Sequence, residues 1–230
     1  MFFNRMDELN GDIVCAVEKW CKLIAGLSSG QRAALAETPL RSLLQIPSLK
    51  MRTLLIQYMV EIFDPSKGRF IVQDLVGEVS LSAVDVECIL ALENHGLSAE
   101  GILGEEGEDV KDRVPPQFLS KTTGNIVIDD LIVDITKNKS ADDDFLRRVV
   151  HVLLGTVLAP MSSKTVPKQY YALVDDVKRI SKINWNAFTL RVLLDCLRNV
   201  RKGKHLRQWP RGNLALLQVH LSDLYHCKKI

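Results

Sequence analysis

The chain has 230 residues, of which 47% are apolar and 25% charged, so it is long enough to bury a sizeable core and has an ordinary globular composition. No window approaches the roughly 18 uninterrupted apolar residues of a membrane-spanning helix, and charges precede any apolar stretch at the N-terminus, which predicts an intracellular protein with no signal peptide and no membrane partner. The net charge of +2 is uneven, because residues 1–115 hold 11 Lys/Arg against 18 Asp/Glu and residues 116–230 hold 19 against 10; either the two halves attract each other or the basic half meets a polyanion.

The N-terminal segment is predicted to form short helices. In the first, Asp12 is the expected N-cap and Gly26 the stop. Ser28 and Gln31 form a capping box for the second. The apolar residues that recur on one face of the first helix are Ile13, Val17, Trp20 and Ile24.

The next segment predicts helices followed by a small β-hairpin. Thr38-Pro39 starts a short helix that Pro47 interrupts. A strongly amphipathic helix precedes the turn at residues 64–68. Its apolar residues are Leu54, Leu55, Tyr58, Met59 and Ile62. The runs 70–72 and 78–81 then read as the two strands of the hairpin.

The middle of the chain is less regular. Ser82 and Asp85 predict a capped helix that Gly96 closes, with Val86, Ile89, Leu90 and Leu92 as its apolar residues. Residues 97–124 are rich in glycine, acids and proline, which predicts a long, mobile surface loop. The apolar run Ile126–Ile135 is compatible with either a strand or a helix.

The C-terminal part predicts three longer helices. Asp142, Asp143 and Asp144 open the first, where carboxylates offset the helix dipole and need no metal, and Pro160 ends it. Asn184 caps the second, which contains Trp185, and the last extends over 214–224. The predicted fold class is therefore mainly α, a single helical domain with a small β-hairpin, preceded by a helical extension at 1–42 and spanning 43–230.

No motif for catalysis, cofactor binding or metal binding emerges. The stretch 26–30 lacks the ending of a phosphate-binding loop. The five cysteines are odd in number and scattered, which predicts free thiols in a reducing compartment. His226 and Cys227 are adjacent, so their side chains point apart, and together with His220 they lack a fourth zinc ligand. We therefore expect no enzyme activity, no cofactor and no metal.

One charged segment, residues 198–211, contains several cations and no acid. Its guanidinium and ammonium groups suit phosphates, and its tryptophan suits stacking on a base. Alternatively, the cations stabilise the carbonyl end of a helix and stay solvated. The candidate nucleic-acid contacts are Arg198, Arg201, Lys202, Lys204, Arg207, Trp209 and Arg211.

Five weak motifs, in the right order between residues 43 and 224, together resemble the plant mobile domain, also labelled aminotransferase-like plant mobile domain. They resemble its opening helix, its Gly-Glu/Thr-Leu/Asp-Val segment, its Leu-x-Pro helix end, its Asn-Trp-Ala helix start and its final Leu-Leu-Gln helix. The segments are Leu54–Pro65 with Phe70, Gly77–Val86 with Leu90, Leu92 and Gly96, Leu158–Pro160, Ile183–Trp185 with Leu190 and Leu194, and Asn213–Gln218. The chain departs from that pattern at Ser80, Ser82 and Asn186, and residues 97–140 match none of it.

The resemblance implies a helical, non-catalytic, nuclear module of plant transposon-derived proteins, linked in some members to transposon silencing, genome maintenance or meristem maintenance. Its partner would be an unidentified protein. Two alternatives stay open: a nucleic-acid-binding domain that uses 198–211, and the non-catalytic part of a truncated SUMO-protease-like transposon protein. No residue marks the Schiff-base lysine that the aminotransferase label would require.

Overall fold

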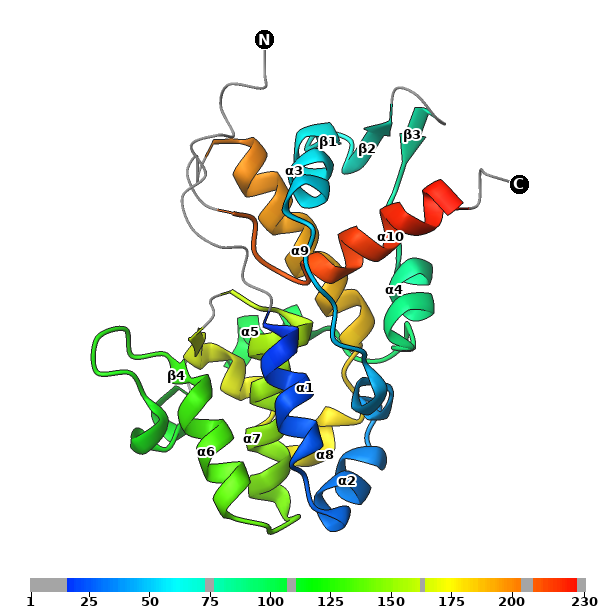
Figure 1. Cartoon of the computed structure of the whole chain (residues 1–230). Coiled ribbons are helices and arrows are strands. Elements are labelled where there is room, and N and C mark those ends of the chain that lie inside the picture. Colours follow the sequence, from blue (N-terminus) through cyan, green and yellow to red (C-terminus); the bar gives the residue numbers. More distant parts are fainter. Residues whose placement is uncertain (1–15, 73–76, 107–110, 162–163, 204–208, 227–230) are drawn as a thin grey trace.

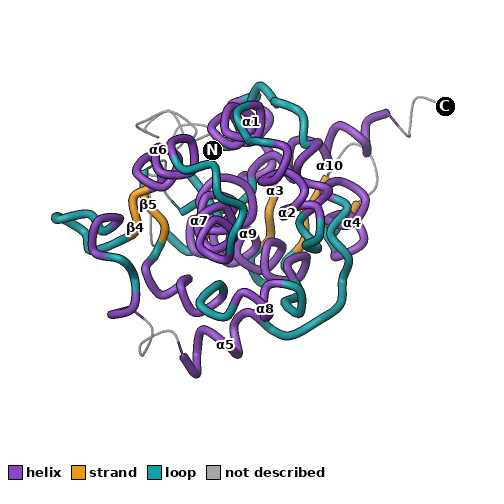
Figure 2. Tube along the Cα trace, turned by 90° about the horizontal axis from the view of Figure 1, so that it is seen from below, coloured by secondary structure: helices purple, strands orange, loops and turns teal. Residues whose placement is uncertain are grey.

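The computed structural model describes residues 16–72, 77–106, 111–161, 164–203 and 209–226 of the chain. Over these residues the protein is mainly α-helical, with two small antiparallel sheets, so the predicted fold class is confirmed (Figures 1 and 2). The helices are mostly short, because caps, prolines and left-handed residues interrupt the chain every ten residues or so.

Two short helices open the described chain, and both were predicted. They are α1 (Val17–Ala25) and α2 (Ser29–Ala36). The expected start of the first helix at residues 12–13 lies outside the described residues. The capping box is confirmed, since the Ser28 hydroxyl accepts from the Gln31 backbone N–H and the Gln31 side chain accepts from the Ser28 N–H.

A three-stranded antiparallel sheet follows α3, in the order β1-β2-β3. The bounds are η2 (Arg41–Gln45, a 3-10 helix), α3 (Thr53–Ile62), β1 (Phe63–Asp64), β2 (Arg69–Val72) and β3 (Gly77–Val79). The predicted hairpin is confirmed, with Phe70 opposite Val79. Strand β1 was not predicted, because two residues directly after a helix are too few to show alternation. The short helix expected from Thr38-Pro39 begins at Arg41 instead.

The predicted helix closure at Gly96 is wrong. Helix α4 (Ala83–Leu90) ends earlier, because Ala91 takes a left-handed conformation with a φ of 50°. Gly96 has a φ of +118° and serves a different purpose: the next residue, Leu97, donates its N–H to the Lys182 carbonyl at 2.6 Å. A Cβ at Gly96 would lie 2.4 Å from that carbonyl oxygen, so only glycine permits this approach.

The prediction that residues 97–124 form a long loop is also wrong, since about half of the segment is helical, and the predicted mobility stays a prediction. The segment holds α5 (Ala99–Glu106), η3 (Lys111–Arg113) and η4 (Pro116–Phe118). Ala99 and Ile102 are buried three residues apart, and Val114 and Phe118 are buried as well. The acidic and glycine-rich composition describes the outer face of the segment, and it conceals the regular spacing of the few apolar residues that face the core.

The ambiguous apolar run from residue 126 to residue 135 is a strand and then a helix. The bounds are β4 (Ile126–Val127), which pairs antiparallel with β5 (Thr165–Val166), α6 (Ile128–Lys137), α7 (Asp143–Leu153) and a π-helical turn, η5 (Leu154–Leu158). The predicted acidic start of α7 is confirmed, and Asp142 is its N-cap, because its carboxylate accepts from the Phe145 N–H at 2.8 Å. The π-helical turn carries the chain to the predicted end near Pro160.

Helix α9 joins two parts of the molecule (Figure 1). The remaining elements are η6 (Lys168–Leu173), α8 (Val177–Ile180), α9 (Trp185–Arg201) and α10 (Leu214–His226). Helix α9 packs against α3, α4, α5, β1 and the π-helical turn. Asn186 near its start bonds the carbonyls of Ala83 and Leu92 on either side of α4, and Arg201 at its end bonds the Phe63 carbonyl of β1. Asn184 caps it as predicted. Trp185 is buried, as expected, and its indole N–H donates to the Ile180 carbonyl at 2.9 Å.

A single apolar cluster runs through the described residues. It includes Trp20 of α1, Leu35 of α2, Met59 of α3, Trp185 of α9 and Leu217 of α10. The first two helices therefore share the core of the rest, and the predicted boundary between residues 42 and 43 stays a prediction.

Candidate interaction surfaces

The basic segment 198–211 lies at the C-terminal end of α9 and is partly engaged within the chain. Arg198 pairs with Asp195 at 2.8 Å, and the Arg201 Nε donates to the Phe63 carbonyl at 3.1 Å. Lys202 and Arg211 are exposed, whereas Trp209 is half-buried against the core. Lys204 and Arg207 lie outside the described residues. Two of the predicted nucleic-acid contacts, Arg198 and Arg201, therefore interact with other residues of the chain at the end of α9.

The turn between β1 and β2 brings further cations to this place, which the sequence pattern did not reveal. A Cβ on Gly68 would lie 3.2 Å from the Arg198 guanidinium, so the turn touches the end of α9. Lys67 and Arg69 flank that glycine, but both pair with Glu78. The hydrogen bonds from these two cations lower the pKa of Glu78, so the carboxylate stays charged and offsets part of the positive charge.

Helix α3 buries a different face from the one its pattern suggested. Ile56, Met59 and Val60 face the core, whereas Leu54 is 80% exposed. Two of the expected core residues, Leu55 and Tyr58, are only half-buried. The helix is apolar around most of its circumference, so periodicity alone allowed more than one buried face, and packing against α9, α10 and β2 decided between them.

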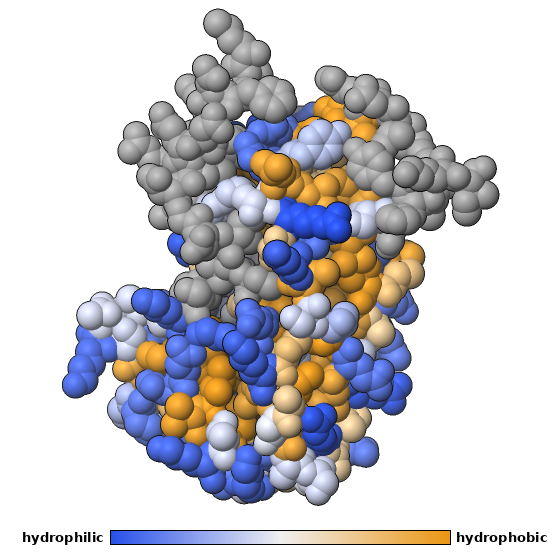
Figure 3. Space-filling model, in the orientation of Figure 1, coloured by the Kyte–Doolittle hydropathy of each residue, from blue (hydrophilic) through white to orange (hydrophobic). Residues whose placement is uncertain are grey.

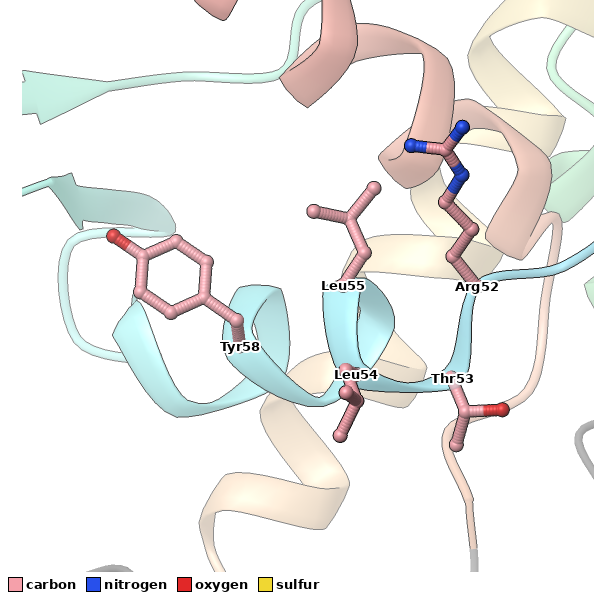
Figure 4. A pocket seen from close by; sticks show the side chains of 5 residues that line it. All are labelled: Arg52, Thr53, Leu54, Leu55 and Tyr58. Atoms are coloured by element: carbon pink, nitrogen blue, oxygen red, sulfur yellow. The ribbon is translucent and has the colours of Figure 1, made fainter.

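The start of α3 borders an open hollow of about 610 Å³ that is lined by Arg52, Thr53, Leu54, Leu55 and Tyr58. Figure 4 shows that Arg52, Leu55 and Tyr58 project to the side where α10 lies, while Leu54 and Thr53 project to the opposite side of the helix. Figure 3 shows hydrophobic residues gathered on the face over α3 and α10. We call these five residues the α3 surface.

The position of the α3 surface depends on Gln218 of α10. Its side-chain Oε1 accepts from the Arg52 backbone N–H at 2.7 Å, and its Nε2 donates to the Lys50 carbonyl at 3.0 Å. The side chain of Arg52, the N-cap residue of α3, makes no capping hydrogen bond to the first turn of the helix. The buried Gln218 therefore satisfies a free N–H at the start of this helix and holds it against α10.

Within the part of the chain that the structure describes, no group of three or more His, Cys, Asp or Glu side chains is arranged to hold a metal ion. His220, weighed above as a zinc ligand, is buried, and its Nδ1 lies 3.2 Å from a carboxylate oxygen of Asp85. Over the same residues, no helix has both the length and the apolar content needed to cross a membrane.

Comparison with known proteins gives one positive result. A family model described as "Domain of unknown function (DUF8566)" matches residues 13–218. Neither the curated proteins nor the solved structures contain a match. The matched range covers α1 to α9 and the part of α10 that holds Gln218, so it includes both the α3 surface and the end of α9.

Proposed function

The chain belongs to the DUF8566 family, and on this premise we propose that it is a non-catalytic interaction module of a plant nuclear protein of transposon ancestry. The nuclear and transposon-derived setting, with its link to silencing, genome maintenance or meristem maintenance, comes from the resemblance to the plant mobile domain. The proposed binding site is the α3 surface. The observation that carries this proposal is Leu54, an 80% exposed leucine that lines a hollow together with the half-buried Leu55 and Tyr58.

The α3 surface suits an amphipathic helix of a protein partner. Leu55 and Tyr58, three residues apart, offer apolar area on the side of α3 to which Arg52 projects (Figure 4), which matches the spacing of side chains on a second helix, and Leu54 adds apolar area at the edge of the hollow. Arg52 stands at one end, and its exposed guanidinium forms no ion pair with any described residue. A carboxylate next to the apolar stripe of the partner would complement that charge.

The test uses two variants with matched positions. Leu54 and Val84 each occupy the second residue of a helix, and both are exposed, at 80% and 68%. An aspartate at either place favours the helix N-terminus, so neither change should unfold the protein. Leu54→Asp places a charge in the hollow, whereas Val84→Asp places a charge on α4, outside the hollow.

The wild type and both variants would be used to capture proteins from plant nuclear extract, with and without nuclease, and each captured protein would then be produced alone and titrated. We expect a partner that resists nuclease, binds the Val84→Asp variant normally and loses binding to the Leu54→Asp variant. Such a partner should contain an amphipathic helix with an acidic residue. Equal binding to the two variants would contradict the proposal.

A nucleic-acid-binding domain is the second candidate, and one contact favours it. The β1–β2 turn, in which Lys67 and Arg69 flank Gly68, meets the Arg198 guanidinium one helical turn before Lys202, so the β1–β2 turn adds two cations distant in sequence to the end of α9. Affinity for DNA or RNA should then fall steeply with salt, because neutralised phosphates release counterions. Fluorescence anisotropy of labelled duplex and single strands across a salt series separates this candidate from the first; absence of binding at low salt removes it.

A further inference from the structure

A second, smaller cavity lies away from the α3 surface, against α7. It has a volume of about 120 Å³. Phe118 of η4, Ile126 of β4 and Leu131 of α6 supply apolar walls, and His151 and Tyr171 supply aromatic ones. The lining also includes the exposed residues Gln117 and Asp144, so the cavity reaches the surface between η4 and the start of α7.

His151 has a polar atom that no described residue satisfies. Its side chain is buried, with 2% exposure, and its ring stacks on Tyr171 with the ring centres 5.4 Å apart. Its Nδ1 lies 2.8 Å from the Arg147 carbonyl oxygen. Because a carbonyl only accepts, Nδ1 carries the proton, and Nε2 is left as an acceptor. Nε2 is buried and has no hydrogen-bond partner.

The charged groups at this cavity are already balanced. Arg147 pairs with Asp144 at 2.7 Å and also donates to the Asp175 carbonyl. Arg148 lies 3.0 Å from Asp134. Burial lowers the pKa of His151 to about 4, so the imidazole is neutral at ordinary pH. A charged ligand would therefore have no unpaired counter-ion here, and a neutral one is favoured.

The size and lining of the cavity specify the ligand further. An apolar protein cavity of about 150 Å³ binds a benzene-sized molecule, so one of about 120 Å³ takes at most a single small ring. The apolar walls are complementary to an apolar ligand, and the unpaired Nε2 is complementary to a ligand with one hydrogen-bond donor. We propose that this cavity binds a small neutral hydroxylated ring, of the class of phenol and small cyclic alcohols, whose hydroxyl donates to His151 Nε2.

The test titrates the wild-type protein with a series of ligands. Binding is monitored through the resonances of the imidazole nitrogens in NMR spectra. Phenol has the ring and the donor, toluene has the ring alone, and benzoate adds a charge. We expect phenol to shift the His151 Nε2 resonance saturably, toluene to bind about tenfold more weakly for want of the hydrogen bond, and benzoate not to bind.

Two variants accompany the series. His151→Phe keeps an aromatic ring and removes the acceptor, so the preference for phenol over toluene should disappear. His220→Gln alters a second buried histidine of the described residues, which does not line this cavity, and should leave phenol binding unchanged.

Equal binding of phenol and toluene to the wild type would overturn the proposal, and so would the absence of any binding at millimolar phenol, which would assign the cavity to water. These two outcomes need no variant, so the proposal stays testable if His151→Phe does not fold. Neither outcome bears on partner binding at the α3 surface, which lies on other elements.

Discussion

The α3 surface and the His151 cavity show opposite mismatches between a side chain and its surroundings. At the start of α3, an apolar side chain, Leu54, stands in water. Beside α7, a polar atom, His151 Nε2, stands in the core without a partner. An exposed leucine costs little free energy, whereas a buried, unpaired acceptor lowers the free energy of unfolding by about 1–3 kcal/mol.

This contrast indicates what kind of ligand each region would bind. An exposed apolar group gains by being covered over a wide area, which only a macromolecular surface provides. A buried acceptor gains from a single hydrogen bond, which a small molecule provides. Because α9 packs towards both parts of the molecule, changes can be chosen that disturb both regions together or one at a time.

The largest expected effect disturbs both regions together. Trp185 is fully packed at the start of α9, where its ring meets Phe188 edge-on and its indole is hydrogen-bonded. Trp185→Ala should therefore cost about 3–5 kcal/mol of the free energy of unfolding. Urea denaturation followed by circular dichroism measures this. An unchanged midpoint would show that Trp185 contributes no packing energy at the start of α9.

The next effect concerns the His151 region alone and depends on pH. In the folded protein the pKa of His151 is about 4, below its ordinary value of 6.5, so the unfolded chain binds the proton more readily. Stability should therefore fall as pH drops from about 6.5 to about 4, by about 3 kcal/mol from this group, and this contribution should level off below that.

The measurement compares urea denaturation of the wild type and His151→Phe at several pH values between 4 and 7. The variant should lose this part of the slope, and Leu54→Asp should keep it. Parallel curves for the wild type and His151→Phe would mean that the buried imidazole takes up protons in the folded state as easily as in the unfolded one.

A smaller loss of stability is expected when the α3 surface loses its hydrogen bonds to Gln218 of α10. Gln218→Ala leaves the Arg52 N–H and the Lys50 carbonyl without their partner from α10. We expect a loss of about 1–3 kcal/mol and faster amide exchange at the first turn of α3. Gln218→Glu keeps the acceptor for the Arg52 N–H, so its stability should lie between those of the wild type and Gln218→Ala. Unchanged exchange in Gln218→Ala would show that α3 holds its place without α10.

The smallest effect tests the second candidate function. Lys202 is exposed at the end of α9 and forms no ion pair with any described residue. If the chain binds duplex DNA through it, Lys202→Ala should reduce the log–log slope of affinity against salt by about 0.9. Arg201→Ala should instead lower stability, because it removes the bond to the Phe63 carbonyl. An unaltered slope in Lys202→Ala would exclude this lysine as a phosphate contact.

Sequence reasoning identified parts of both candidate sites but neither arrangement. It recognised Leu54, Leu55 and Tyr58 as one apolar set, yet it expected them to be core. It singled out Arg198 and Arg201 by charge, but it had no signal for the partner of Arg201, since Phe63 lies 138 residues earlier. His151 drew no attention, because nothing local distinguishes a buried histidine from an exposed one. Asn186, a departure from the plant mobile domain pattern, is buried and bonds the carbonyls of Ala83 and Leu92.

The helical class, the hairpin, the caps at Ser28, Ser82 and Asn184 and the acidic start of α7 could all be predicted from the sequence. Each cap is a hydrogen bond between residues three apart, so its energy depends on neighbours that any reader of the chain can see. Three features depend on tertiary contacts: which face of α3 is buried, the helices within residues 97–124, and the hydrogen bond of Gln218 to Arg52 across 166 residues. These outcomes depend on which surfaces meet after folding, and burial and long-range hydrogen bonding carry no local pattern.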